Sequence, residues 1–358
     1  MADRATDTDR LDVIARDALS AYGVPPQARL TLLTISENAT YRLDDAGTGP
    51  SSVLRVHRPG YHSLDAIRSE LAWVRALRAD GVVSTPAVLP ALDGSLVTAG
   101  THPDGERRHV VRFAWVDGIE PAGSRLVDDF RTLGAIAARL HRQARTWPAP
   151  AGFTRFRWDY ETSVGPRGHW GRWQDGMGVG LAERAVLGRL DALLAERLAA
   201  FGDGPDRFGL VHADMRLANL LVDPATDPGE VSVIDFDDCG FGWFMYDLGS
   251  SLSFMEHDPQ VPELIDAWVS GYRDVAPLSA QEEAELPTFV LLRRLLLVAW
   301  IGSHHDTDLA QEMGVEFTRV TCDLAEGYLS RFGGVSSPCG RWRAPANPAN
   351  PGPARSAP

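Results

Sequence analysis

LVHADMRLANLLVDPATDPGEVSVIDFDDCGFG, residues 210–242, holds two short apolar runs that carry acids where a buried strand normally excludes charge. Each run is hydrophobic enough to form a strand, and the segment DPATDPG between them is typical of a turn. The two runs are therefore predicted to pair as a hairpin. The acids inside it need an explanation, because buried charges require partners or a metal.

The spacing of the polar residues indicates a chemical role. In a hairpin, the amide of Asn219 and the carboxylate of Asp235 can face one cavity, and both offer the hard oxygen ligands that suit Mg²⁺. Asp214 lies five residues before Asn219, in a loop where it can accept a proton from an attacking hydroxyl. Phosphoryl transfer requires such a metal and such a base. The alternative is a polar turn, which accounts for Asp223 and Asp227 but not for Asp214 or Asp235.

The pattern H-x-D-x-x-x-x-N, followed by two apolar residues and D-F-D, resembles the catalytic and metal segments of the aminoglycoside phosphotransferase/choline kinase family. The second segment is most similar to the branch that holds homoserine kinase type II, hydroxylysine kinase and a stress-response kinase. The resemblance implies that Asp214 is the catalytic base and that Arg216 contacts the γ-phosphate of ATP. It also implies that Asn219 and Asp235 bind Mg²⁺, whereas His212 supports the loop.

The family resemblance implies an α+β, protein-kinase-like fold, and the rest of the chain fits it. We expect an antiparallel β-rich N-lobe with one helix laid across it over residues 1–115, and a mainly helical C-lobe over 116–333. The Pro- and Ala-rich tail, 334–358, is expected to be disordered. Periodicity predicts strands at 30–36, 39–44, 51–58 and within 82–98 and 107–118, and helices at 10–22, 64–79, 126–144, 181–201 and from 246 to 331.

The nucleotide-binding residues follow from the same resemblance. A kinase N-lobe needs donors over the phosphates and a cation on the third strand paired with a helix acid. The first turn has no glycine, and Ser36 and Asn38 are its candidate donors, with an ordinary hairpin turn as the alternative. Arg55 stands where the family usually has Lys and keeps the charge. Glu70 is its expected partner, although a solvated helix acid is the alternative.

A strand that ends near residue 115 is predicted to lead into the hinge. Backbone groups from Phe113 to Trp115 would contact adenine there, although Trp115 also fits core packing. The missing glycine loop and Arg55 also fit a non-catalytic nucleotide-binding module. The presence of all three hairpin residues argues against that alternative.

The phosphate acceptor is the least determined part. We expect a small hydroxyl acceptor that carries an amine, such as an aminoglycoside, an amino alcohol or a hydroxy amino acid, with a protein Ser/Thr acceptor as the runner-up. A charge run near residue 304 is also typical of a solvated loop. The aromatic and Arg-rich loop 155–173 either gates the cleft or covers a helix groove. The candidate acceptor residues are Glu256, His257, Asp258, Trp300, His304, His305, Asp306 and Asp308.

Composition excludes several classes of protein. The net charge of −13 argues against nucleic-acid binding, and all 35 basic residues are Arg because the sequence has no Lys. Three widely spaced cysteines provide no disulfide framework or metal-ligand spacing. The polar start lacks a secretory signal, so a cytoplasmic protein is expected. The longest apolar segment, 289–302, is judged too short for a membrane span and contains Arg293 and Arg294.

Overall fold

The computed structural model describes residues 2–35, 38–44, 49–121, 123, 125–225 and 230–334. Ser36 and, apart from Gly334, the tail expected to be disordered therefore lie outside the described residues. The chain forms two compact units, and the lobe boundary expected at residue 115 stays a prediction. The first unit comprises Met1–Arg125, Arg139–Arg157 and Leu210–Phe241, and the remaining segments form the second.

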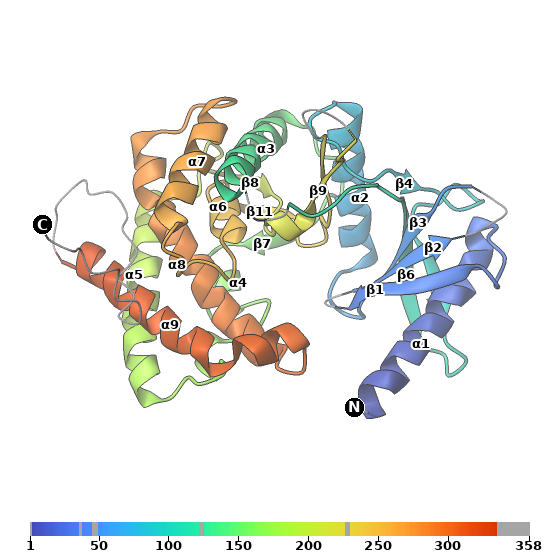
Figure 1. The fold of residues 1–358 in the computed structure, drawn as a ribbon, viewed down its shortest axis with the longest axis horizontal. Coiled ribbons are helices and arrows are strands. Elements are labelled where there is room, and N and C mark those ends of the chain that lie inside the picture. The colour runs from blue at the N-terminus through green and yellow to red at the C-terminus, as the bar shows by residue number, and fades with distance from the viewer. Residues whose placement is uncertain are drawn as a thin grey trace, which may run out of the picture. The chain divides into compact units, whose positions relative to one another are not determined.

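The first unit is built on an antiparallel sheet with the order β1-β2-β3-β6-β4, and β5 also pairs with β6 (Figure 1). The first three strands pair in chain order, each antiparallel to the next, and form a meander. The segment predicted to contain strands at 82–98 forms only the two short strands β4 and β5. The strands are β1 Arg29–Ile35, β2 Ala39–Asp44, β3 Ser52–Val56, β4 Val88–Leu89, β5 Thr98–Thr101 and β6 Arg107–Ala114.

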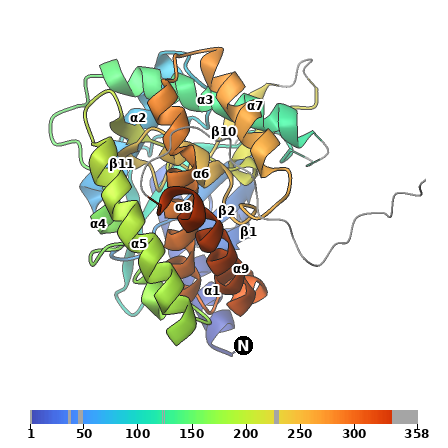
Figure 2. The same cartoon turned by 90° about the vertical axis from the view of Figure 1, so that its left-hand side faces the viewer.

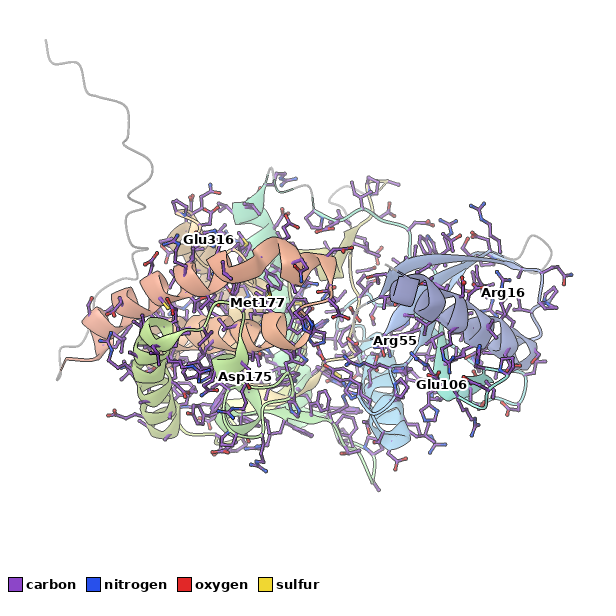
Figure 3. The ribbon with its side chains drawn as sticks, turned by 90° about the horizontal axis from the view of Figure 1, so that it is seen from below. Arg16, Arg55, Glu106, Asp175, Met177 and Glu316 are labelled. Atoms are coloured by element: carbon purple, nitrogen blue, oxygen red, sulfur yellow. The ribbon has the colours of Figure 1, made fainter. Side chains whose placement is uncertain are left out.

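Two helices, α1 (Ala2–Ala18) and α2 (Leu64–Ala79), cover opposite faces of this sheet. Successive side chains of a strand point to opposite faces. Val110 accordingly packs with the core of α1, whereas Val111 packs with the core of α2. Arg16 on α1 donates to the carbonyls of Pro26 and Ala28, both at 3.2 Å, and so fastens that helix beside β1 (Figure 3).

The bounds of α2 match the prediction, but those of α1 do not. Ser63 accepts a hydrogen bond from the backbone of Ala66 and so caps α2 at the predicted position. α1 begins at Ala2 rather than at residue 10, and a 3₁₀ helix, η1 (Leu19–Tyr22), completes it. The polar start of α1 has no apolar periodicity, so its sequence carried no helix signal.

The predicted hairpin is present in the first unit. Strand β9 (Leu220–Val222) pairs antiparallel with β10 (Val231–Val233), and Leu220 lies opposite Val233. A 3₁₀ helix, η3 (Leu217–Asn219), precedes β9. The start of the first run belongs instead to β8, in a three-stranded sheet with the order β7-β11-β8. Its strands are β7 Phe156–Trp158, β8 Phe208–Val211 and β11 Gly240–Trp243.

The second unit is helical, as expected for the C-terminal half, and Figure 2 shows α5, α8 and α9 packed together. α6 approaches α8 closely because Gly249 has no side chain: a Cβ there would lie 2.5 Å from the carbonyl oxygen of Phe289. α3 begins in this unit and ends in the first. The helices are α3 Leu126–Thr146, α4 Tyr160–Ser163, η2 Trp173–Asp175, α5 Leu181–Phe201, α6 Tyr246–Ser251, α7 Val261–Arg273, α8 Ala280–Ser303 and α9 Asp308–Phe332.

Helix α8 corrects one expectation from the sequence. Its 24 residues are long and apolar enough to cross a membrane, so length does not exclude a span. However, 83% of its most apolar 18-residue window is buried inside the fold. Such burial is typical of a core helix, which is apolar on all sides because neighbours surround it.

The aromatic loop after β7 covers a helix groove. Trp170 and Trp173 are buried, and the guanidinium of Arg293 on α8 lies 5.1 Å from the centre of the Trp170 ring. Gly176, just beyond η2, packs so tightly on α8 that a Cβ would lie 2.5 Å from a methyl of Val298. Of the two alternatives for this loop, these contacts favour packing.

Candidate active site

The loop between β8 and β9 brings Asp214, Arg216 and Asn219 together in the first unit. Oδ2 of Asp214 accepts hydrogen bonds from Nδ2 of Asn219 at 2.8 Å and from Nε of Arg216 at 3.1 Å. Nδ2 of Asn219 also donates to the backbone carbonyl of Asp214 at 2.8 Å. The carboxylate is thus held in one orientation by two donors, although its side chain keeps 15% of its surface exposed.

His212 shapes the backbone of this loop. It is fully buried, its Nδ1 accepts from the backbone N–H of Asp214 at 3.3 Å, and its Nε2 bonds the carbonyl of Ile234 at 3.0 Å. With Nδ1 as acceptor, Nε2 carries the proton and donates. The imidazole therefore links the catalytic loop to the end of β10, which is the supporting position expected from the sequence.

The hairpin register places Asn219 beside residues 235–239, the segment expected to bind metal, which is called the metal segment below. The backbone N–H of Ile234 donates to the carbonyl of Asn219 at 2.9 Å, so Asp235 follows at the same end of the hairpin. Asp235 has a positive φ of 63°. A non-glycine residue rarely adopts this conformation, and such strain persists where the surrounding structure enforces it.

Asp235 and Asp237 form an acidic pair. Desolvation by the surrounding protein, then the charge of Asp237, raise the pKa of the Asp235 carboxyl well above its ordinary value. Because the Asp235 side chain is also exposed to solvent, desolvation acts on it less than on an enclosed carboxyl. We therefore regard the like charge of Asp237 as the better-founded cause. A cation placed here would relieve that repulsion.

The donor set fits a divalent cation. Both hydrogen bonds of the Asn219 side chain use Nδ2, which leaves Oδ1 without a partner among the described residues. An amide oxygen and the carboxylate of Asp235, from the same end of the hairpin, are the hard-oxygen ligands that Mg²⁺ and Ca²⁺ select. Within the described ranges, no group of three or more His, Cys, Asp or Glu forms a cluster that could hold a metal.

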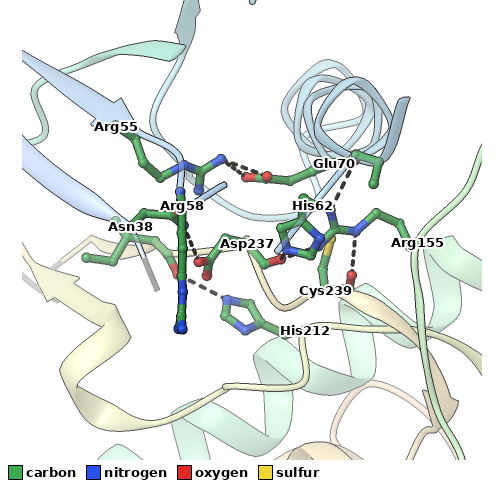
Figure 4. A network of polar contacts seen from close by, with 11 residues as sticks. Asn38, Arg55, Arg58, His62, Glu70, Arg155, His212, Asp237 and Cys239 are labelled. Carbon is green, nitrogen blue, oxygen red and sulfur yellow. Dashed lines mark hydrogen bonds and ion pairs between the residues drawn. The ribbon is translucent and has the colours of Figure 1, made fainter. Parts of the chain in front are cut away.

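Arg55 on β3 and Glu70 on α2 form a buried ion pair in the first unit, with the geometry that the sequence led us to expect (Figure 4). Nη2 of Arg55 donates to both carboxylate oxygens of Glu70, at 2.6 and 2.7 Å. Burial opposes the charge of Arg55, but Glu70 and the two acids of the metal segment outweigh it and raise the pKa of the guanidinium. Nε of Arg55 is buried and has no hydrogen-bond partner among the described residues.

Asn38, at the end of the first turn, contacts the metal segment. Its Nδ2 donates to Oδ2 of Asp237 at 2.6 Å, and its Oδ1 accepts from the backbone N–H of Arg58 at 3.1 Å (Figure 4). Both ends of the amide are thus occupied, and Asn38 would have to exchange a partner to bind phosphate. Its predicted role as a phosphate donor, like that of Ser36, stays a prediction.

The expected adenine-binding segment lies at the end of β6. Phe113 packs beside the α2 core, and the guanidinium of Arg55 lies 5.1 Å from the centre of its ring. Nε1 of Trp115 donates to Asp117 at 3.0 Å, and Arg42 lies over its ring at 4.5 Å. The backbone N–H of Trp115 donates to the carbonyl of Ser51 at 3.3 Å. Trp115 thus has surface contacts rather than a place in the core.

Three residues around the metal segment escaped the sequence reasoning. Tyr61 donates to Oδ1 of Asp238 at 2.5 Å, and Nε2 of His62 bonds the carbonyl of Asp237 at 2.7 Å. Arg155 donates to that carbonyl and also to the carbonyl of Cys239, at 2.6 Å. These contacts join segments that are far apart in the chain. The sequence indicated none of them, except that Arg155 lies at the start of an aromatic-rich loop.

The candidate acceptor residues lie in the second unit and differ in exposure. Glu256 is fully buried and bonds Arg294 at 2.6 Å, so it is a core acid in this structure. Trp300 and His304 are buried and stacked at 4.9 Å. Asp258 is half-buried, and the exposed candidates are His257, His305, Asp306 and Asp308.

Comparison with known proteins places the chain in a family. Residues 31–282 match the phosphotransferase enzyme family of aminoglycoside phosphotransferases. A solved structure of a microcompartment-associated aminopropanol kinase is 50% identical, with a TM-score of 0.83, and the match covers 89% of this chain and 98% of that one. The amicoumacin kinase of Bacillus subtilis strain 168 is 25% identical over 84% of this chain and 87% of that protein.

A solved amicoumacin kinase in complex with AMP-PNP, Ca²⁺ and Ami shares the fold, with a TM-score of 0.70 and 23% identity over 86% of this chain and 91% of that one. Shorter stretches, each about a third of the chain or less, are similar to a homoserine kinase of Neisseria meningitidis and a hydroxylysine kinase of Xenopus laevis. The predicted family and the predicted α+β, protein-kinase-like fold are confirmed. The chain belongs to the phosphotransferase enzyme family and is a small-molecule kinase, an enzyme that transfers a phosphoryl group to a hydroxyl group.

Proposed function

We propose that this enzyme transfers the γ-phosphate of ATP, with Mg²⁺, to the hydroxyl of a small amino alcohol. The observation that carries the proposal is the arrangement of Asp214, Asn219 and Asp235 at one end of the β9–β10 hairpin. The choice of acceptor rests on the 50% identity to an aminopropanol kinase. The nucleotide and the divalent ion are supported by the AMP-PNP and Ca²⁺ bound to a related amicoumacin kinase.

Asp214 acts as the general base in this proposal. Its carboxylate takes the proton of the acceptor hydroxyl while the hydroxyl oxygen forms a bond to the γ-phosphorus and the bond from that phosphorus to ADP breaks. The hydrogen bonds from Asn219 and Arg216 to Oδ2 fix the carboxylate in the orientation from which it would take the proton. Arg216, held against Asp214, would neutralise charge on the transferred group.

The remaining site residues bind and orient the nucleotide. Nε of Arg55 has a proton to donate and lies in a buried position near the acids, which suits a phosphate oxygen. Glu70 holds that guanidinium in place. Ser36 and Asn38 would donate to phosphates from the first turn, and Phe113 and Trp115 flank the segment proposed for adenine.

Asn219 and Asp235 would hold the Mg²⁺, through an amide oxygen and a carboxylate oxygen. When bound, the ion supplies positive charge that neutralises the phosphate oxygens. The acidic pair of Asp235 and Asp237 is suited to attract it, because the repulsion between these carboxylates falls when a cation is present.

The test is phosphoryl transfer from labelled ATP to a panel of amino alcohols, hydroxy amino acids, aminoglycosides and a generic protein. Asp214→Asn should lower transfer by about 10²–10⁴-fold and leave nucleotide binding intact. Asp223→Asn is the matched control, because it removes one charge from the same hairpin and Asn can still accept from the backbone of Ala225. Asp235→Asn should abolish the Mg²⁺ dependence of nucleotide binding.

The outcomes separate the alternatives. Transfer only to the protein substrate would favour a protein Ser/Thr kinase. Nucleotide binding without transfer to any acceptor, and without slow ATP hydrolysis, would favour a non-catalytic nucleotide-binding module. Unchanged transfer by Asp214→Asn would contradict its role as the base.

A further inference from the structure

Arg155 makes an unusual set of contacts for a buried arginine. Its side chain lies beside the metal segment and α2, and three of its nitrogens donate to three backbone carbonyls (Figure 4). Nε bonds Cys239 at 2.6 Å, Nη1 bonds Ala66 at 3.0 Å, and Nη2 bonds Asp237. Buried guanidinium groups usually pair with carboxylates, so a set made entirely of carbonyls indicates that Arg155 holds backbone in place.

The three carbonyls belong to the two segments that build the nucleotide and metal site. Asp237 and Cys239 follow Asp235 by two and four residues. Ala66 lies on α2, one turn before Glu70, whose carboxylate holds Arg55. One planar group therefore joins the metal segment to the helix that orients the phosphate-binding cation.

A second contact fixes the segment that carries Arg155 on the same helix. The backbone N–H of Thr154 donates to Oγ of Ser69 at 2.9 Å. The backbone next to Arg155 is thus held against α2, independently of the contacts that the guanidinium makes with the metal segment. Because the contact comes from the adjacent residue, the position of Arg155 does not depend on its own side chain alone.

Asp235 needs such support. It adopts a left-handed backbone conformation that is disfavoured for an aspartate. The carbonyl of Asp237 is held from two sides, by Nη2 of Arg155 and by Nε2 of His62 at 2.7 Å. A backbone fixed two residues downstream limits how far the Asp235 carboxylate can turn away.

We propose that Arg155 is a positioning residue for the metal site: it fixes the backbone after Asp235 so that this carboxylate is presented to a divalent cation, and it couples that presentation to α2. The inference rests on the proposed metal role of Asp235. Lysine cannot replace it, because a single ammonium cannot reach three carbonyls that a planar fork contacts in three directions.

The test compares Arg155→Lys with Arg157→Lys, an exposed arginine on β7 two residues along. Nucleotide binding and, at saturating ATP and acceptor, phosphoryl transfer are each measured against Mg²⁺ concentration. Arg155→Lys should raise the half-saturating Mg²⁺ concentration by about tenfold or more, as observed for residues that support metal ligands. The rate at saturating Mg²⁺ should largely recover, and Arg157→Lys should match the parent. A merely structural role predicts a lower rate at every Mg²⁺ concentration and the same half-saturating concentration, which would overturn the proposal.

His62 provides a second test if Arg155→Lys does not fold. His62→Gln keeps a nitrogen that can donate to the carbonyl of Asp237, whereas His62→Leu removes it. Only His62→Leu should raise the half-saturating Mg²⁺ concentration, and equal values for the two variants would count against support through that carbonyl. If the parent itself shows no Mg²⁺-dependent transfer, the proposed function fails. If the parent and Asp235→Asn behave as proposed and the supporting variants do not, the positioning inference alone fails.

Discussion

The Arg55–Glu70 pair of the first unit and the Arg294–Glu256 pair of the second are both closed off from solvent, and each has an ion-pair distance of 2.6 Å. They use their guanidinium groups differently. Arg55 donates from one nitrogen only, Nη2, to both oxygens of Glu70. Arg294 donates from all three of its nitrogens.

Arg294 on α8 connects three separate groups. Nη1 bonds Glu256, Nε bonds Oγ1 of Thr321 at 2.8 Å, and Nη2 bonds the carbonyl of Phe317 at 3.1 Å. The guanidinium also lies 3.4 Å from the centre of the Phe317 ring. This arginine ties α8 to α9. Arg55 instead has a buried Nε without a partner among the described residues, and this N–H is the one proposed to donate to a phosphate.

The largest expected effect concerns Arg294. Arg294→Met leaves the Glu256 charge buried without a partner, and we expect a loss of about 3–5 kcal/mol in the free energy of unfolding, measured by urea denaturation. Arg319→Met is the control, because Arg319 is an exposed arginine of α9 with acidic partners, and its loss should not shift the unfolding midpoint measurably. Equal midpoints for the two variants would show that the buried pair does not stabilise the second unit.

A smaller effect distinguishes the two pairs directly. Arg55→Lys keeps a cation that can bond both oxygens of Glu70, and Lys is the usual residue of the family at this position. We expect it to lose less than about 1 kcal/mol of stability, because the ion pair with Glu70 is kept, whereas Arg294→Lys should lose about 2–3 kcal/mol with two hydrogen bonds. If both substitutions cost the same in urea denaturation, the two arginines are structurally equivalent and the comparison breaks.

The smallest effect is a pH dependence near Arg55. His57, on the same strand face, is buried, and neither ring nitrogen has a hydrogen-bond partner among the described residues. Burial, followed by the charges of Arg55, His62, His109 and Arg155, lowers the pKa of His57 well below its ordinary value. The unfolded chain therefore binds a proton below about pH 6.5 that the folded chain does not.

Stability should accordingly fall as the pH drops from about 7 to 5, by up to about 1.4 kcal/mol per pH unit from this group. His57→Leu should reduce that slope in urea denaturation measured across the same range. His305→Leu, at an exposed position, is the control for the loss of an imidazole. An unchanged slope in His57→Leu would indicate that the surroundings of Arg55 accommodate the charged imidazole.

Much of the site could be predicted from the sequence because its residues are close together in the chain. Asp214 and Asn219 directly precede the β9–β10 hairpin and Asp235 directly follows it, so the pairing of two neighbouring segments brings them near one another. The Arg55–Glu70 pair could also be predicted, since a strand and the helix that follows it commonly pack together. Glu256 is the opposite case. It was expected to contact the acceptor, and nothing in the neighbouring sequence indicated that it would form a buried ion pair with Arg294.

The sequence by itself determined the family, the α+β fold and the identity of the residues proposed for chemistry, because local patterns encode strands, helices, turns and a short catalytic motif. Only the tertiary structure decided how those residues are supported. Asn38 bonds Asp237 across 199 residues, and Arg155 reaches the metal segment across more than 80. Contacts at such separations arise from the packing of whole elements, and residue spacing along the chain does not record them.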